Sequence, residues 1–370
     1  MLPTRRILIY APPVTAGIDD PPSSMKLAKE QRRAMARRAV CALVGAVVAL
    51  VVAPPLRAEA NELRISRSSG IGYLQIMVME HERLIEKETA ARGLGEVNVH
   101  WTAFADALGS TNALLAGKVD IVAGGLGSFV TLWERTQGTI GVKGIAALDS
   151  MPMLLVTRNP DVKSLRDLGA QHRIAVPGVK VSSQATTLQY AAAQAYGAAE
   201  WARLDNLTVN LGHPTAVQLL QQEGSGITAH FASPPYQYVE LRDPSMHTIL
   251  NSYDVWGGPQ TFALVWTTTP FRAQNPNLYA AFYAALGKAT EFIRRRPLQA
   301  AAIYVAMSRE TNATAGEIAK MLEDPQIRFT LTPQNVAKFA AFKVDTGALG
   351  ANPRRWQDLF FPEVHGLPGS

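Results

Sequence analysis

The stretch NALLAGKVDIVAGGLGS, Asn112–Ser128, decides the fold. The residues around its start, Ser110–Ala116, predict a short helix, and Asp120–Ala123 predicts an apolar strand. The strand enters the glycine-rich turn Gly124–Ser128, after which a helix is expected as far as Gln137. A helix, a strand, a tight turn and a second helix in so short a span are typical of an α/β fold.

The same alternation of short strands and helices extends along the chain in both directions. A strand at 63–65 precedes a Ser-Gly loop at 68–72 and a helix that runs to about residue 92. Further strands are expected at residues 97–102, 144–148, 153–157, 173–176, 208–211, 227–231, 248–250 and 262–267. The pattern predicts an α/β fold whose sheets are largely parallel and flanked by helices.

The C-terminal part is predicted to be almost entirely helical. Helices are expected at residues 276–296, 298–307, 314–324 and 332–347. Thr314 begins a capping box with Glu317, and Pro333 takes a first helical position after Thr332.

The N-terminus has the three parts of an export signal. Four arginines precede an uncharged run of 15 residues, Ala39–Ala53, and the small-x-small sequence Ala58–Ala60 follows. The run is short for a membrane span, which needs about 20 residues. We expect residues 1–60 to be a signal peptide, with cleavage after Ala60 and export to the periplasm. The real start of the signal peptide could be Met25 or Met35.

Removal of this segment changes the charge and the cysteine content of the chain. The whole chain has 36 basic and 30 acidic residues, of which 27 and 26 lie after residue 60, so its high pI belongs mostly to the signal. This balance argues against a nucleic-acid partner. Cys41 is the only cysteine and leaves with the signal, which excludes disulfides and thiol chemistry afterwards. No cofactor or metal site is expected.

Four motifs, taken in order, resemble one family of binding proteins. The motifs are NALLAGKVDIV at 112–122, GLGS at 125–128, SLRDL at 164–168 and IAVPG at 174–178. Behind an export signal, this order and spacing are similar to the periplasmic binding proteins for nitrate, sulfonate, taurine and related solutes. The resemblance covers roughly residues 62–305.

The resemblance implies a two-lobed periplasmic-binding-protein fold of type II with a solute in the cleft between the lobes. By this analogy, the first lobe is 61–152 plus 265–370, and the second is 153–264. Two crossover strands are expected near 153–157 and 262–267. The protein would be a non-catalytic, monomeric receptor that delivers a small-molecule solute to an ABC permease in the cytoplasmic membrane.

Ligands of open α/β sheets bind beyond the carboxyl ends of the strands, where helix N-termini attract negative charge. Three loops meet this description, and each carries glycines, hydroxyls or a cation. The residues expected to contact the solute are Ser68, Ser69, Gly70 and Tyr73 in the first loop, Gly125, Gly127 and Ser128 in the second, and Lys180, Ser182 and Ser183 in the third.

The remaining loops of the second lobe offer further contacts. His213 and Ser233 could face the cleft, and Tyr236 and Trp256 could stack on an organic solute, although a core position is equally plausible for Trp256. The favoured solute is a small organic anion, such as a sulfonate, a taurine-like compound or a carboxylate, although no clear arginine clamp is evident. The alternative is a neutral or heteroaromatic solute, such as a thiamine pyrimidine precursor. A hydrolase nucleophile is not supported, because Leu126 breaks the Gly-x-Ser-x-Gly pattern. The absence of cysteine after residue 60 argues against an enzyme related to the pyrimidine-precursor synthases that share this fold.

Overall fold

The computed structural model describes residues 32, 34–36, 59–104, 107–308, 313–350 and 353–370. The chain divides into two compact units, Met1–Ala58 and Glu59–Ser370. In the first unit, Arg32 and residues 34–36 are helical, and the other residues of that unit lie outside the described residues. Glu59 and Ala60, the last two residues of the predicted signal peptide, belong to the second unit. No helix of the described part has the length and apolar character that crossing a membrane requires.

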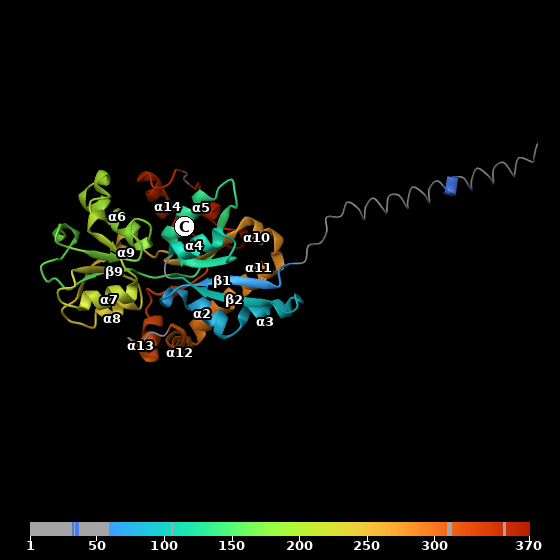
Figure 1. Cartoon of the computed structure of the whole chain (residues 1–370), viewed down its shortest axis with the longest axis horizontal. Helices are drawn as coiled ribbons and strands as arrows, with labels where there is room; N and C mark the ends of the chain where they lie inside the picture. Colours follow the sequence, from blue (N-terminus) through green and yellow to red (C-terminus); the bar gives the residue numbers. More distant parts are fainter. Residues whose placement is uncertain (1–31, 33, 37–58, 105–106, 309–312, 351–352) are drawn as a thin grey trace, which may run out of the picture. The chain divides into compact units, whose positions relative to one another are not determined.

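The second unit contains two five-stranded sheets, and its two halves are visible in Figure 1. The first sheet has the strand order β2-β1-β3-β11-β4. Its strands are β1 (Glu62–Arg67), β2 (Asn98–Ala103), β3 (Ile121–Gly125), β4 (Val142–Ala147) and β11 (Ala263–Thr268). β1 pairs in parallel with β2 and β3, whereas β11 runs antiparallel to β3 and β4.

The second sheet has the order β10-β6-β9-β7-β8. Its strands are β6 (Leu154–Thr157), β7 (Ile174–Val176), β8 (Thr208–Asn210), β9 (Ala229–Ala232) and β10 (His247–Asn251). β7 pairs in parallel with β8 and β9, and β6 runs antiparallel to β9 and β10. Each sheet is therefore mixed, with one antiparallel strand, and the α/β fold class predicted from the sequence is confirmed.

The antiparallel strand of each sheet is the first strand after the chain changes sheets. The chain leaves the first sheet through residues 148–153 and returns through 252–262, so that β6 and β11 are the first strands on each side. The crossovers expected at 153–157 and 262–267 correspond to these two strands, and the chain changes sheets just before each. The first connection holds β5 (Asp149–Ser150), which pairs with β12 (Arg328–Phe329).

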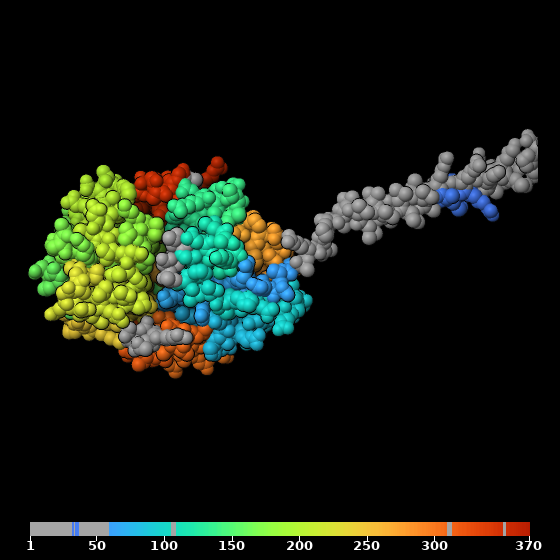
Figure 2. Space-filling view, in the orientation of Figure 1, coloured from blue at the N-terminus to red at the C-terminus, as the bar shows by residue number. Residues whose placement is uncertain are grey.

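Helices cover the sheets and fill the C-terminal part. They are η1 (Ile71–Tyr73), α2 (Leu74–His81), α3 (Leu84–Ala91), α4 (Ala107–Leu115), α5 (Leu126–Arg135), α6 (Ser183–Tyr196), α7 (His213–Gln221), α8 (Tyr236–Glu240), α9 (Ser252–Trp256), α10 (Thr269–Gln274), α11 (Pro276–Arg295), α12 (Pro297–Ser308), α13 (Ala315–Leu322) and α14 (Val336–Asp345), with short 3-10 turns elsewhere. Figure 2 shows the red C-terminal segment at the top and the dark orange segment at the bottom of the boundary between the green-yellow and blue-cyan halves.

The C-terminal helices confirm one sequence prediction and correct another. Thr314 caps α13 as expected, because its Oγ1 accepts a hydrogen bond from the backbone N–H of Glu317 (3.2 Å). The expectation of a helix start at Thr332 with Pro333 in its first turn was wrong. Asn335 has φ of 54°, a left-handed conformation that interrupts the helix, and α14 begins only at Val336.

Aromatic packing fixes the core of the first sheet at positions where only glycine fits. Phe129 of α5 packs against Trp266 of β11 and against Phe360, with ring centroids 5.6 Å apart in both pairs. A Cβ at Gly144 of β4 would overlap the Phe360 ring, and one at Gly124 would overlap the Trp266 ring. These glycines therefore make room for the rings rather than supply a special backbone conformation.

We predict that Gly144→Ala destabilises the protein by about 1–3 kcal/mol, the usual cost of overpacking a close-packed core. Gly287→Ala in α11 is the matched control, because a Cβ there meets open space and alanine favours a helix. Urea unfolding of both variants measures the difference. Equal stability of Gly144→Ala and the wild type would contradict the packing account.

Candidate functional site

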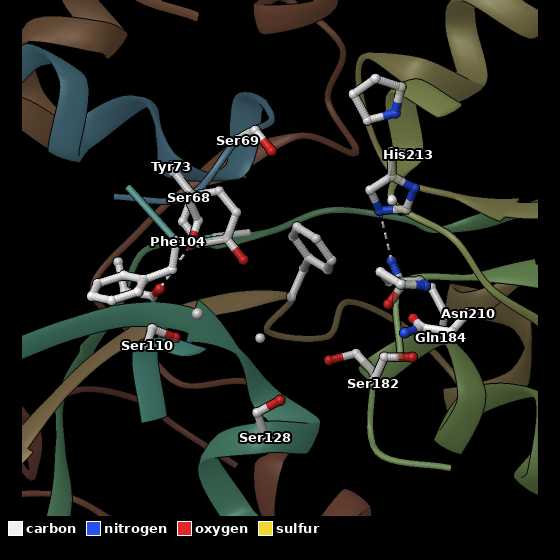
Figure 3. Close-up of a pocket in the computed structure, with 18 residues that line it drawn as sticks. Ser68, Ser69, Tyr73, Phe104, Ser110, Ser128, Ser182, Gln184, Asn210 and His213 are labelled. Atoms are coloured by element: carbon white, nitrogen blue, oxygen red, sulfur yellow. Dashed lines mark hydrogen bonds between the residues drawn. The ribbon is translucent and has the colours of Figure 1, made fainter. Parts of the chain in front are cut away.

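A cavity of about 420 Å³ lies between the two sheets, and both sheets contribute to its walls (Figure 3). On the first side, its lining follows the carboxyl ends of β1, β2 and β3. On the second side, it follows the ends of β7 and β8. This is the edge at which open α/β sheets bind ligands.

Hydroxyl groups and an aromatic ring form the wall beside β1. Ser68 and Ser69 directly follow β1, and Tyr73 lies one turn later. Ser68 Oγ donates a hydrogen bond to the carbonyl oxygen of Ala123 (3.0 Å), which ties this loop to β3. Gly70 has φ of 102°, a conformation that side chains disfavour, and it allows the chain to turn between strand and helix.

Helix starts form the opposite wall. Ser182 caps α6, because its Oγ accepts a hydrogen bond from the backbone N–H of Ala185 (3.1 Å). Gly212 precedes α7, and His213 is the first residue of that helix. Asn210 ends β8 and also lines the cavity. Figure 3 shows Ser182, Asn210 and His213 across the cavity from Ser68 and Tyr73.

The two walls touch each other beside the cavity. The backbone N–H of Gly127 in α5 donates to Ser183 Oγ at the start of α6 (3.2 Å). A Cβ at Gly127 would collide with the backbone carbonyl of Val181, so only glycine permits this approach. The backbone N–H of Ile71 donates to the carbonyl oxygen of Pro234 (3.4 Å), which makes a second contact between the halves.

The electrostatic character of the cavity comes from helix starts rather than from formal charges. None of the described residues in its lining is Lys, Arg, Asp or Glu. The helices α5, α6 and α7 all begin at the cavity, and their first N–H groups carry a partial positive charge. Burial, and then the nearby Asp149 carboxyl, raises the pKa of Tyr73, so its hydroxyl stays protonated and able to donate.

His213 is the ionisable imidazole of this lining. Burial, and then the adjacent ring of His230, lowers the pKa of His213, so the imidazole is neutral near pH 7. Its Nε2 lies 3.2 Å from Ser233 Oγ and 3.3 Å from the side-chain amide nitrogen of Gln184. The neutral ring can present either a donor or an acceptor, depending on its tautomer.

The structure brings most of the residues expected from the sequence to this one cavity. Those that line it are Ser68, Ser69, Tyr73, Gly125, Ser128, Ser182, Ser183 and His213. Ser233 and Tyr236 lie directly behind His213, since the Tyr236 ring stacks on the imidazole with centroids 5.1 Å apart. They support the wall without lining it.

Four other expected residues do not line the cavity. Gly70 and Gly127 act at the turn and at the contact between the walls described above. Lys180 has φ of 65° and an exposed side chain. Trp256 is buried in the core, where its indole N–H donates to Thr187 Oγ1 (3.0 Å) and its ring stacks on Tyr190 (4.5 Å).

Sequence reasoning missed several lining residues. Phe104, Ser110, Gln184, Asn210 and Phe262 belong to the wall. Asn210 could have been found, because it lies at the carboxyl end of a strand that the sequence predicts. Phe262 gave no such signal, since an aromatic residue before an apolar strand is equally typical of a core.

Solved structures with the same fold include proteins that bind sulfonates and nitrate. The periplasmic aliphatic sulphonate binding protein SsuA from Escherichia coli is similar, with 18% identity, a TM-score of 0.60, and coverage of 82% of this chain and 93% of that one. The alkanesulfonate-binding protein SsuA from Xanthomonas axonopodis pv. citri, bound to MOPS, has 15% identity, a TM-score of 0.62, and coverage of 80% and 96%. The nitrate-binding protein NrtA from Synechocystis PCC 6803 has 12% identity, a TM-score of 0.62, and coverage of 79% and 83%.

At the level of sequence, no family model and no curated protein matches the chain. The likeness therefore rests on the arrangement of the two sheets, their helices and the double crossing between them. The chain has the periplasmic-binding-protein fold, in the form shared by the sulfonate- and nitrate-binding proteins.

Proposed function

We propose that this protein is the extracytoplasmic solute-binding component of an ABC importer and binds a small organic anion between two lobes. The first lobe is 61–152 plus 265–370 and the second is 153–264. The observation that carries the proposal is the convergence of three helix starts on one cavity whose described lining holds no carboxylate. Backbone N–H groups at such positions favour an anion and repel a cation.

The composition of the wall supports an organic anion. Serine hydroxyls and the side chains of Asn210 and Gln184 can donate to oxygens, whereas Phe104 and Phe262 offer apolar surface to a carbon chain. The cavity volume of about 420 Å³ suits a small organic molecule better than a bare inorganic ion. The structurally similar proteins named for sulfonates agree with this class.

Export and transport complete the proposed role. The predicted signal peptide at residues 1–60 would deliver the chain to the periplasm, where it would act as a monomer. Closure of the lobes by a hinge motion would bury the solute and present a surface to a permease in the cytoplasmic membrane. No catalytic step is part of this role.

A neutral or heteroaromatic solute is the second candidate. The absence of Lys and Arg from the described lining favours it, and the rings of Tyr73, Phe104 and Phe262 could contact a flat heterocycle. The dependence of binding on salt separates the two solutes, because attraction between charges weakens as ionic strength rises.

A melting experiment with a solute panel tests the proposed function. We expect alkyl sulfonates, taurine or a carboxylate to raise the melting temperature of the purified protein by several degrees. A ligand at 100 times its Kd adds about 2.7 kcal/mol of stability. A rise with pyrimidines alone would favour the second candidate. The panel also includes nitrate and bicarbonate. If no member of the panel raises the melting temperature, neither candidate solute class is supported.

Contact between the walls gives a second prediction. Gly127→Ala should weaken solute binding at least tenfold, because its Cβ prevents the approach of α5 to the start of α6. The fold should persist, since alanine favours the helix that it joins. Titration calorimetry measures the Kd, with Gly287→Ala as the matched helical control. Wild-type affinity in Gly127→Ala would contradict closure of the cavity through this contact.

A further inference from the structure

A chain of three ionisable side chains runs from the cavity into the second sheet. His213 Nδ1 lies 2.8 Å from His230 Nε2, and His230 Nδ1 lies 2.5 Å from Glu240 Oε1. His230 and Glu240 have no exposed side-chain surface. Only the cavity end of the chain, His213, meets the site described above.

Three separate elements position these groups. His213 is the first residue of α7, His230 lies in β9, and Glu240 is the last residue of α8. The strands on either side of β9 place Val156 and Ala175 opposite His230, and both are apolar.

Other polar groups contact the cavity end of the chain. Tyr236 of α8 stacks on His213, and Ser233 and Gln184 lie at its cavity end. Among the described residues, no charged side chain from a neighbouring element contributes to the pKa shifts of these three groups.

The surroundings favour a neutral chain. Glu240 Oε2 is buried and has no hydrogen-bond partner among the described residues, and a carboxylate in that position would be costly. Burial raises the pKa of Glu240 to about 9 and lowers the pKa of His230 to about 3. Both shifts favour a carboxyl that keeps its proton and donates it to His230 Nδ1.

The direction of the remaining hydrogen bonds follows from that proton. Since His230 Nδ1 accepts, its Nε2 carries the ring proton and donates to His213 Nδ1. His213 then carries its own proton on Nε2, which becomes an N–H donor at the cavity. The structure places the amide nitrogen of Gln184 3.3 Å from this atom, so the relay requires the amide to exchange the places of its nitrogen and oxygen, which leaves the shape of the side chain unchanged.

We propose that Glu240, His230 and His213 form a proton relay that sets whether His213 offers the solute a donor or an acceptor. The inference rests on the proposed function, and it assigns His213 as a specificity-determining contact for anionic oxygens. Removal of one proton reverses the direction of each hydrogen bond in the chain. The Nε2 proton of His213 leaves to solvent, the His230 Nε2 proton moves to His213 Nδ1, and the Glu240 proton moves to His230 Nδ1.

The deprotonated relay disfavours the binding of an anion for two reasons. His213 Nε2 becomes an acceptor, and a negative charge remains on Glu240. Because the anion stabilises the protonated relay, the relay loses its proton at higher pH in the complex than in the free protein. Affinity for an anion is therefore constant near pH 7 and falls by about tenfold per pH unit above the pKa of the free relay.

The first test needs no solute. In ¹⁵N NMR of the histidine rings of the whole protein, His213 should carry its proton on Nε2 at pH 7 and on Nδ1 above about pH 10. His172 is an internal control, because its Nδ1 accepts from the backbone N–H of Gly169 (2.9 Å) and it lies outside the relay. A proton on Nδ1 of His213 at pH 7, or an unchanged tautomer at pH 10, would overturn the proposal.

The second test links the relay to binding, with ethanesulfonate as the probe. Its Kd in the wild type should rise with pH as stated, whereas Glu240→Gln should show no such rise, because an amide does not titrate. Parallel pH profiles in the two proteins would overturn the proposal. If ethanesulfonate binds at no pH, the anion assignment of the proposed function fails, and the tautomer titration still decides the relay. The wild-type titration also stands if Glu240→Gln does not fold.

Discussion

The backbone N–H groups at the starts of α6 and α7 are the constraint on which the site depends. The first N–H groups of a helix have no partner within the helix and require a cap, a ligand or water. Three helix starts face the cavity. At α5 the first two N–H groups are already bonded, that of Leu126 to the carbonyl oxygen of Phe262 (3.1 Å) and that of Gly127 to Ser183 Oγ (3.2 Å). At α6 and α7, Ser182 is the side-chain cap found among the described residues, so their other first N–H groups remain available. An anionic group between the walls would satisfy several of these donors at once, which is why the site can attract charge without a lysine or an arginine.

The double crossing of the chain produces this convergence. Each sheet directs the carboxyl ends of its parallel strands, and the helices that follow them, toward the other sheet. The C-terminal part then links the halves away from the cavity. Lys338 Nζ of α14 donates to the carbonyl oxygen of Trp256 (2.7 Å), and Tyr238 Oη of α8 donates to Asp324 Oδ2 (2.7 Å). These contacts restrict how the second half can move relative to the first.

Much of the fold and part of the site could be predicted from the sequence, because both depend on local patterns. Alternating strands and helices predict the sheets, and serines and glycines that follow the strands predict residues on both walls of the cavity. The relay could not be predicted, since His213, His230 and Glu240 come from three elements and no spacing connects them. Trp256 was ambiguous for the same reason: its burial depends on Tyr190 and on α14, which are distant in sequence.

The central claim is that an anionic oxygen group binds between the two sheets, against the helix starts and His213. A crystal structure of the protein with 2-bromoethanesulfonate tests it most directly, because the anomalous signal of bromine locates one end of the molecule. The account predicts a bromine peak in the cavity, with sulfonate oxygens within about 3.2 Å of His213 Nε2 and of backbone N–H groups at the start of α6 or α7. A fully occupied ligand elsewhere, or one with its bromine against the helix starts, would contradict it.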